Sequence, residues 1–207
     1  MCGIVGYIGR EKCIPRIISG LESLEYRGYD SAGIAYITKK GIEISKEEGR
    51  IENLKFEVDM TNKSMIGIGH TRWATHGKPS SINSHPHMDN SRKFAVVHNG
   101  IIENYADLKD FLKSHNYNFL SETDTEVIPN LIHYHYTSSK ENQNTKFLQA
   151  VSSACKMLKG SFAIEILCSD FPENMIVVRK DSPLVIGKGL KECYISSDIP
   201  AILSFTK

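Results

Sequence analysis

A cysteine at the second position of the chain offers a nucleophile near a chain end. If the initiator methionine is removed, Cys2 carries a free α-amine beside its own thiol. An α-amine titrates near ~7.7–8.0 and a thiol near ~8.5, so part of the amine is unprotonated at neutral pH. That amine can accept the thiol proton, directly or through a water molecule, as in amino-terminal threonine nucleophiles. The sequence therefore predicts that Cys2 attacks a carbonyl carbon, although a cysteine at position 2 also occurs by chance.

Two further clusters carry groups that bind oxygen atoms, and both follow predicted strands. Residues 70–77 include Arg72, whose planar guanidinium can bind a carboxylate through two parallel hydrogen bonds. In the second cluster, the side-chain amide of Asn99 and the backbone N–H of Gly100 offer two donors toward one point. Two convergent donors are the requirement for an oxyanion hole, and glycine lets the backbone approach a substrate closely.

A third cluster, residues 121–126, places hydroxyl and acidic side chains directly before a predicted helix. One interpretation is that Asp124 accepts an ammonium group. The alternative is structural, because a hydroxyl or acidic residue followed three positions later by Glu is typical of a helix-capping box. Together with Cys2, the three clusters suit an amino-acid amide as substrate, and glutamine is the obvious candidate.

Metal binding has little support in the sequence. No CxxC motif occurs, and the two histidine pairs, His85 with His87 and His133 with His135, have no carboxylate or thiol alongside. Residues two apart share a face only in a strand, so we expect these histidines to be solvated or hydrogen-bonded. No metal and no cofactor is predicted.

Composition limits the class of protein. With 207 residues, 41% hydrophobic and 24% charged, the chain can bury the core of one domain. Its net charge of +1, without a Lys/Arg block, makes nucleic acid and anionic membranes poor partners. No apolar run approaches the ~18–20 residues of a membrane span. Five scattered cysteines suit a reducing compartment, so we expect a cytoplasmic protein.

Hydrophobic periodicity predicts an α+β fold in which blocks of helices alternate with groups of strands. Helices are expected over residues 11–26, 51–58, 104–115, 125–135 and 146–158. Strands are expected over residues 3–8, 33–38, 41–45, 65–71, 94–98, 161–168, 175–179, 184–186 and 193–195. The polar loop between the strands at 65–71 and 94–98 is long, and such loops often carry function.

Six segments of the sequence resemble the glutaminase domains of the glucosamine-6-phosphate synthase (glutamine–fructose-6-phosphate aminotransferase) family, which are class II glutamine amidotransferases. They occur in the family's order and extend over nearly the whole chain. The segments are residues 1–6 (MCGIVG), 24–33 (LEYRGYDSAG), 70–77 (HTRWATHG), 83–87 (NSHPH), 98–104 (HNGIIEN) and 121–127 (SETDTEV). The second and third are long and specific, and related class II amidotransferases differ there.

The resemblance implies a fold and a role for each site residue. The implied fold is a four-layer αββα sandwich of the amino-terminal-nucleophile hydrolase type. The implied nucleophile is Cys2, which forms a γ-glutamyl thioester, with Asn99 and Gly100 as the oxyanion hole. The roles implied for the remaining residues are listed here: Arg72, Thr75 and His76 bind the glutamine α-carboxylate, Asp124 binds the α-ammonium, Trp73 gates an ammonia passage, and Arg27 lies at the inter-domain contact.

The resemblance also implies a larger protein and leaves alternatives. In the family a sugar-phosphate isomerase region, which binds fructose 6-phosphate, follows the glutaminase domain, and the full-length enzyme is a homo-oligomer. We expect residues 1–207 to be a glutaminase domain that is shortened at its C-terminal end and lacks the isomerase region. The alternatives are an amidotransferase half for another acceptor and a non-catalytic module that keeps the fold.

Overall fold

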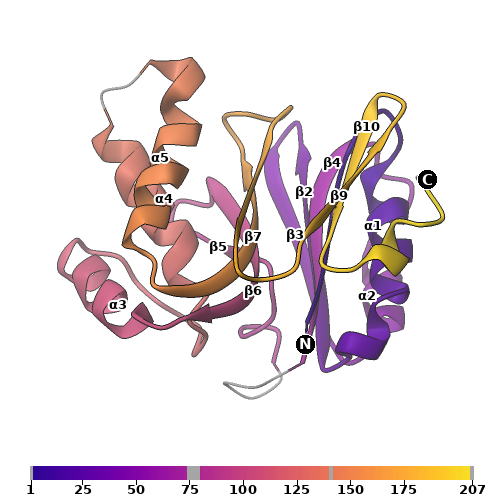
Figure 1. Cartoon of the computed structure of the whole chain (residues 1–207), viewed down its shortest axis with the longest axis horizontal. Coiled ribbons are helices and arrows are strands. Elements are labelled where there is room, and N and C mark those ends of the chain that lie inside the picture. The colour runs from indigo at the N-terminus through magenta and orange to yellow at the C-terminus, as the bar shows by residue number, and fades with distance from the viewer. Residues whose placement is uncertain (1, 74–79, 140–141, 206–207) are drawn as a thin grey trace.

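The computed structural model describes residues 2–73, 80–139 and 142–205 (Figure 1). Within these residues, ten strands form two antiparallel sheets. Thr75 and His76, which the resemblance assigns to binding of the α-carboxylate, lie outside the described ranges. In the part of the chain described, no helix is long and apolar enough to cross a membrane.

The first sheet has six strands in the order β3-β2-β4-β1-β10-β9. Its central strand β1 is almost completely buried and pairs with β4 on one side and β10 on the other. The β2–β3 hairpin turns at residues 39–40, as predicted. The bounds are β1 Gly3–Ile8, β2 Ser31–Thr38, β3 Gly41–Glu48, β4 Ile66–Arg72, β9 Val185–Gly189 and β10 Glu192–Ser196.

The second sheet has four strands in the order β5-β6-β7-β8. Strand β6 runs to Ile102, four residues beyond the predicted end, because its pairing with β7 continues as far as Gly160. Strand β5 was not predicted, since its two residues are too few to show a period. The bounds are β5 His87–Met88, β6 Phe94–Ile102, β7 Gly160–Cys168 and β8 Met175–Lys180.

Helices cover the outer face of each sheet (Figure 1). Helices α1 (Cys13–Glu22) and α2 (Ile51–Glu57) pack on the first sheet, and α3 (Tyr105–Ser114), α4 (Val127–Ser138) and α5 (Gln143–Met157) pack on the second. The helix predicted over residues 11–26 is shorter than expected. It ends at Glu22, and the chain tightens into a 3-10 turn over Glu25–Arg27.

Three buried clusters show that the molecule has four layers, and they confirm the predicted αββα arrangement. The outer clusters join each sheet to its own helices. The third cluster lies between the two sheets, because alternate side chains of each strand point to opposite faces. Its fully buried members include Ile4 and Ile68 from the first sheet and Ala95, Val97, Ala163 and Leu167 from the second.

Candidate active site

The sulfur of Cys2 lies beside the backbone of Trp73. Strand β1 pairs with β4 through Gly3 and Thr71, and this register brings the start of the chain next to residue 73. The Trp73 N–H donates to Cys2 Sγ at 3.3 Å, and Sγ lies 3.7 Å from the Trp73 carbonyl oxygen. The sulfur therefore lies within reach of one backbone donor and one backbone acceptor of the same residue.

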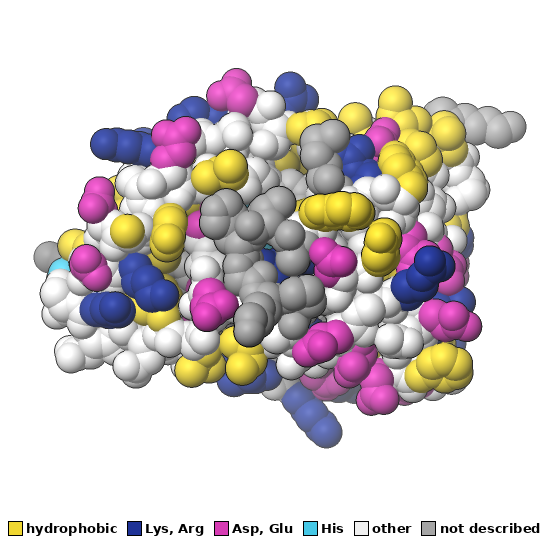
Figure 2. All heavy atoms as spheres, turned by 90° about the horizontal axis from the view of Figure 1, so that it is seen from below, with side chains coloured by type: hydrophobic (Ala, Val, Ile, Leu, Met, Phe, Trp, Pro, Cys, Tyr) yellow, Lys and Arg dark blue, Asp and Glu magenta, His cyan; other side chains and the backbone are white. Residues whose placement is uncertain are grey.

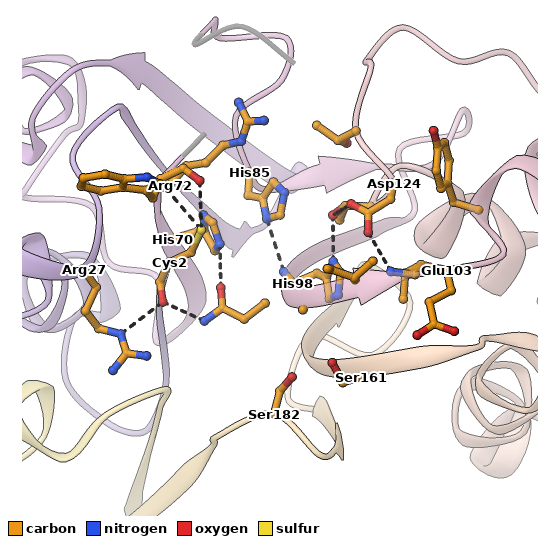
Figure 3. Close-up of a pocket in the computed structure, with 18 of the residues that line it drawn as sticks. Cys2, Arg27, His70, Arg72, His85, His98, Glu103, Asp124, Ser161 and Ser182 are labelled. Carbon is orange, nitrogen blue, oxygen red and sulfur yellow. Dashed lines mark hydrogen bonds between the residues drawn. The ribbon is translucent and has the colours of Figure 1, made fainter. Parts of the chain in front are cut away.

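The main chain of Cys2 is fixed by two side chains (Figure 3). Its carbonyl oxygen accepts from Asn99 Nδ2 at 2.9 Å and from Arg27 Nε at 3.4 Å. Arg27 also forms an ion pair with Asp198 at 2.6 Å, and Tyr26 donates to the same carboxylate oxygen at 2.7 Å. Arg27 therefore contacts the backbone of the predicted nucleophile, a contact that the sequence did not reveal.

Asn99 and Gly100 lie on β6, in the sheet opposite Cys2. The amide oxygen of Asn99 is 3.0 Å from Nε2 of His70, which lies on β4. Gly100 adopts φ +128°, and a Cβ built there would lie 2.0 Å from the Ser161 carbonyl oxygen. No other residue fits at position 100 without a shift of the backbone.

The two predicted substrate-binding charges lie on either side of the same cavity. Arg72 ends β4 and is only 6% exposed. Burial lowers the pKa of Arg72, and the nearby Cys2, Asp30 and Asp124 oppose that shift. Asp124 precedes α4, and its Oδ2 accepts the Ile102 N–H at 2.8 Å.

The capping-box interpretation of residues 121–126 is wrong. The N-cap of α4 is Glu126, and no side chain caps the helix there. The Glu126 carboxylate instead accepts the backbone N–H groups of Leu120 and Ser121, at 3.0 and 2.6 Å. Pro129 lies in the first turn of α4.

One cavity of about 480 Å³ collects the predicted site residues that the structure describes, a volume within the usual range for small-molecule sites. Its lining includes Cys2, Arg27, Arg72, Trp73, Asn99, Gly100 and Asp124 (Figure 3). Trp73 is 44% exposed and packs edge-to-face against Tyr29, with ring centroids 5.6 Å apart.

On the face of the molecule in Figure 2, acidic and basic side chains are interspersed.

Four buried histidines next to the cavity were not recognised as one group from the sequence. The ring of His85 is tilted against that of His70, with ring centroids 4.1 Å apart, and its centroid lies 5.0 and 6.5 Å from those of His87 and His98. Burial lowers the pKa of His70 to about 3 and that of His98 to about 4, and it lowers those of His85 and His87 well below the usual value. All four rings are therefore neutral at pH 7.

These histidines are hydrogen-bonded rather than solvated. His98 Nδ1 lies 2.9 Å from Thr125 Oγ1, and His87 Nε2 lies 3.1 Å from Thr123 Oγ1. Among the described residues, no group of three or more His, Cys, Asp or Glu is arranged to hold a metal ion. The available sequence signal was the high number of histidines between positions 70 and 98.

The fold and the cavity define a glutamine amidotransferase domain of the amino-terminal-nucleophile hydrolase type. The family model described as "Glutamine amidotransferase domain" matches residues 70–204, and the chain belongs to this family. Over its full length, it is 52% identical to a glutamine–fructose-6-phosphate aminotransferase (isomerizing) of Clostridium perfringens and 51% identical to that of Gloeobacter violaceus. It spans 33% of each of those proteins, or about a third of their length.

A solved structure supports the same fold. The glutamine phosphoribosylpyrophosphate amidotransferase from B. subtilis, complexed with ADP and GMP, superposes with a TM-score of 0.80 at 28% identity. The match covers 97% of this chain and 43% of that protein. It confirms the predicted four-layer fold of the amino-terminal-nucleophile type.

Proposed function

We propose that this chain hydrolyses L-glutamine to glutamate and ammonia, as the glutaminase part of a glutamine–fructose-6-phosphate aminotransferase. The observation that most strongly supports this proposal is that Cys2 shares one cavity with a convergent set of polar groups. The amide of Asn99, the guanidinium of Arg72 and the carboxylate of Asp124 all line it. This set provides a nucleophile, a hydrogen-bond donor, a cation and an anion for one amino-acid amide.

The first step is attack by sulfur on the side-chain amide carbon of glutamine. The α-amine of Cys2, free once Met1 is removed, takes the thiol proton, while the Trp73 N–H supports the developing thiolate. A carbon–sulfur bond forms, and the amide π-electrons move onto oxygen. When the tetrahedral intermediate collapses, the carbon–nitrogen bond breaks and the amine returns the proton to the leaving ammonia. The product on the enzyme is a γ-glutamyl thioester, which water then hydrolyses to glutamate.

The oxyanion of that intermediate is assigned to Asn99 Nδ2 and the Gly100 N–H. Asn99 Nδ2 already points at the Cys2 residue, to whose carbonyl oxygen it donates at 2.9 Å. Donors that are in place before reaction stabilise a developing charge without reorganisation. Removal of one such donor lowers kcat by about 10²–10³-fold.

The α-carboxylate and α-ammonium of glutamine are assigned to Arg72 and Asp124. Buried Arg72 can bind a carboxylate through two parallel hydrogen bonds, and the free capacity of the Asp124 carboxylate can accept an ammonium. Thr75 and His76, which lie outside the described residues, are proposed to assist Arg72.

We extend the proposal to the whole protein. The shared name of the relatives favours fructose 6-phosphate as acceptor over any other acceptor, and the presence of each described site residue favours an enzyme over a non-catalytic module. A sugar-phosphate isomerase region would receive the ammonia, and Trp73 would gate its passage. Arg27 would lie at the contact between the two domains. The full-length enzyme would be a homo-oligomer. The five free cysteines support a cytoplasmic location.

Assays of glutamate release test this proposal. Residues 2–207, with Cys2 at the amino terminus, should release glutamate and ammonia from glutamine, but form no glucosamine 6-phosphate when fructose 6-phosphate is added. Cys2→Ala should reduce glutamate release to background with an unchanged melting temperature. Intact-mass measurement on the same samples reports whether Met1 is present. Full activity with Met1 retained would show that another group deprotonates the thiol.

A further inference from the structure

Among the described residues, His70 is the one side chain that hydrogen-bonds the oxygen end of the Asn99 amide. The imidazole Nε2 lies 3.0 Å from Asn99 Oδ1, and the nitrogen end of the same amide donates to the Cys2 carbonyl oxygen at 2.9 Å. The amide therefore bridges a histidine of one sheet and the nucleophile's backbone (Figure 3).

Elementary hydrogen-bond chemistry fixes which way this amide points. A backbone carbonyl oxygen only accepts, so the end of the Asn99 amide that faces the Cys2 oxygen must be the NH₂ group. The other end is then the carbonyl oxygen, which also only accepts. His70 must therefore carry its proton on Nε2 and donate it to Asn99.

The environment of His70 holds this arrangement in place. His70 is on β4 and is 1% exposed, and its ring is tilted by 31° against the ring of His85, with ring centroids 4.1 Å apart. Burial is the main reason that the pKa of His70 falls to about 3, and its hydrogen bond to Asn99 opposes the shift only in part. The neutral ring has one N–H, and that N–H faces Asn99.

We infer that His70 is a positioning residue, which sets the orientation of the Asn99 amide so that its NH₂ group faces the reacting centre. The inference rests on the proposed function, because it gives Asn99 Nδ2 the role of oxyanion donor. Without the Nε2–H donor, the amide can rotate by half a turn about its terminal bond. It would then present an oxygen to the oxyanion, and the stabilising contact would become repulsive.

This role differs from that of a catalytic base. The single proton of His70 is directed at Asn99, and the ring touches neither the sulfur nor a reacting atom in the contacts described here. Its loss should therefore affect the stabilisation of the transition state and leave the binding of ground-state glutamine intact.

Two amide substitutions separate this role from general packing. In His70→Gln the side-chain nitrogen lies as many bonds from Cβ as Nε2 of the histidine does, so it can donate to Asn99. In His70→Asn the amide is one bond shorter and does not reach. Both variants replace a neutral buried ring by a neutral amide, and they form a matched pair. The protein is used at its natural length, with glutamate release measured with and without fructose 6-phosphate.

The readouts are kcat, KM and the affinity for two probes. L-Glutamate γ-semialdehyde reports on the oxyanion hole, since the Cys2 thiol adds to its carbonyl carbon and the former carbonyl oxygen takes the place of the oxyanion. L-Glutamate reports on ground-state binding. His70→Asn should lower kcat by about 10–10²-fold, less than removal of an oxyanion donor outright. The aldehyde should bind weaker by a similar factor, with KM and the Kd of glutamate within about twofold of the parent. His70→Gln should recover most of the loss.

Three outcomes would overturn the inference: parental kcat in a folded His70→Asn variant, equal kcat in the two variants, or equal weakening of the aldehyde and glutamate. If either variant is too unstable to assay, the folded one still decides, because each has its own predicted kcat and aldehyde affinity. A failure of the proposed function looks different, because the parent protein itself would release no glutamate and bind no aldehyde.

Discussion

Gly6 faces Glu165 across the space between the two sheets, and a Cβ on Gly6 would lie 2.6 Å from Glu165 Oε2. The Glu165 side chain is completely buried, and within the described residues neither of its carboxyl oxygens has a hydrogen-bond partner. Burial therefore raises the pKa of Glu165 well above its usual value. The glycine on β1 leaves room for a carboxyl group that the proposed mechanism does not use.

Glu165 should make the protein less stable as the pH rises. In the unfolded chain a glutamate loses its proton near pH ~4.3, whereas the folded protein keeps it to higher pH. The folded state therefore binds more protons in this window, and its free energy of unfolding falls with increasing pH. Glu165→Met, which removes the unpaired polar group, should stabilise the protein at pH 8 by about 1–3 kcal/mol in urea unfolding. An equal or lower stability of Glu165→Met at that pH would contradict this account.

Gly100→Ala should destabilise the protein far more than Gly41→Ala. Both glycines have positive φ, +128° and +112°, so both variants bear the cost of that backbone conformation, about 1–2 kcal/mol. Only the Cβ at position 100 meets backbone, at 2.0 Å from the Ser161 oxygen, while the site at 41 has nothing described within 4 Å. The difference in unfolding free energy should be at least about 1–3 kcal/mol. Similar stabilities would show that β6 and β7 can separate at this point.

Most elements were predictable from the sequence because they follow local periodicity. The short apolar runs in residues 3–8 and 161–168 and the apolar spacing in residues 104–115 gave elements that the structure confirms to within about two residues. The 3-10 turn after Glu22 and the two-residue strand β5 were not predictable, since neither is long enough to show a period.

The site was only partly predictable, for a different physical reason. Residue types indicated Cys2, Arg72, Asn99 and Asp124, and these line one cavity. Contacts between them depend on how sheets pair and stack. The approach of Trp73 to Cys2 follows from the register of β1 and β4, and no local pattern encodes it. The hydrogen bond from His70 to Asn99 joins different sheets, so it is a tertiary relationship too.

The histidine group should make the protein sensitive to acid. The folded-state pKa values of His70 and His98, about 3 and about 4, lie below the unfolded value of ~6.5, and those of His85 and His87 are also lowered. Below that pH the unfolded chain binds more protons, so stability present at pH 7 is lost as the pH falls.

Below pH ~6.5, each of these histidines lowers the free energy of unfolding by up to about 1.4 kcal/mol for each pH unit that the pH falls. Glu165 has the opposite effect, because the folded state binds one more proton there than the unfolded chain. Urea unfolding at pH 7.5, 6.5 and 5.5 should therefore show that the free energy of unfolding declines steeply as the pH falls. His87→Gln should make this decline shallower, because one fewer proton is taken up on unfolding. A parent stability that does not change between pH 7.5 and 5.5 would rule out four buried neutral rings.

Arg72→Lys should weaken glutamine binding more than it slows the maximal rate. A point charge replaces a planar group with two parallel donors, and both substrate and transition state lose the same contact. With a charged hydrogen bond contributing about 1.5–3 kcal/mol, KM should rise about 10–10²-fold. Asp124→Asn keeps an acceptor for the Ile102 N–H and should show the same pattern. A lower kcat with an unchanged KM in both variants would exclude them as the substrate clamp.

Mass spectrometry of acid-quenched turnover mixtures tests directly whether the Cys2 sulfur forms a thioester with the glutamyl group. The protein should gain the mass of one glutamyl group, peptide mapping should place that group on Cys2, and Cys2→Ala should gain none. Glutamate release without any adduct on Cys2, or with the adduct on Cys155 or Cys193, would contradict it.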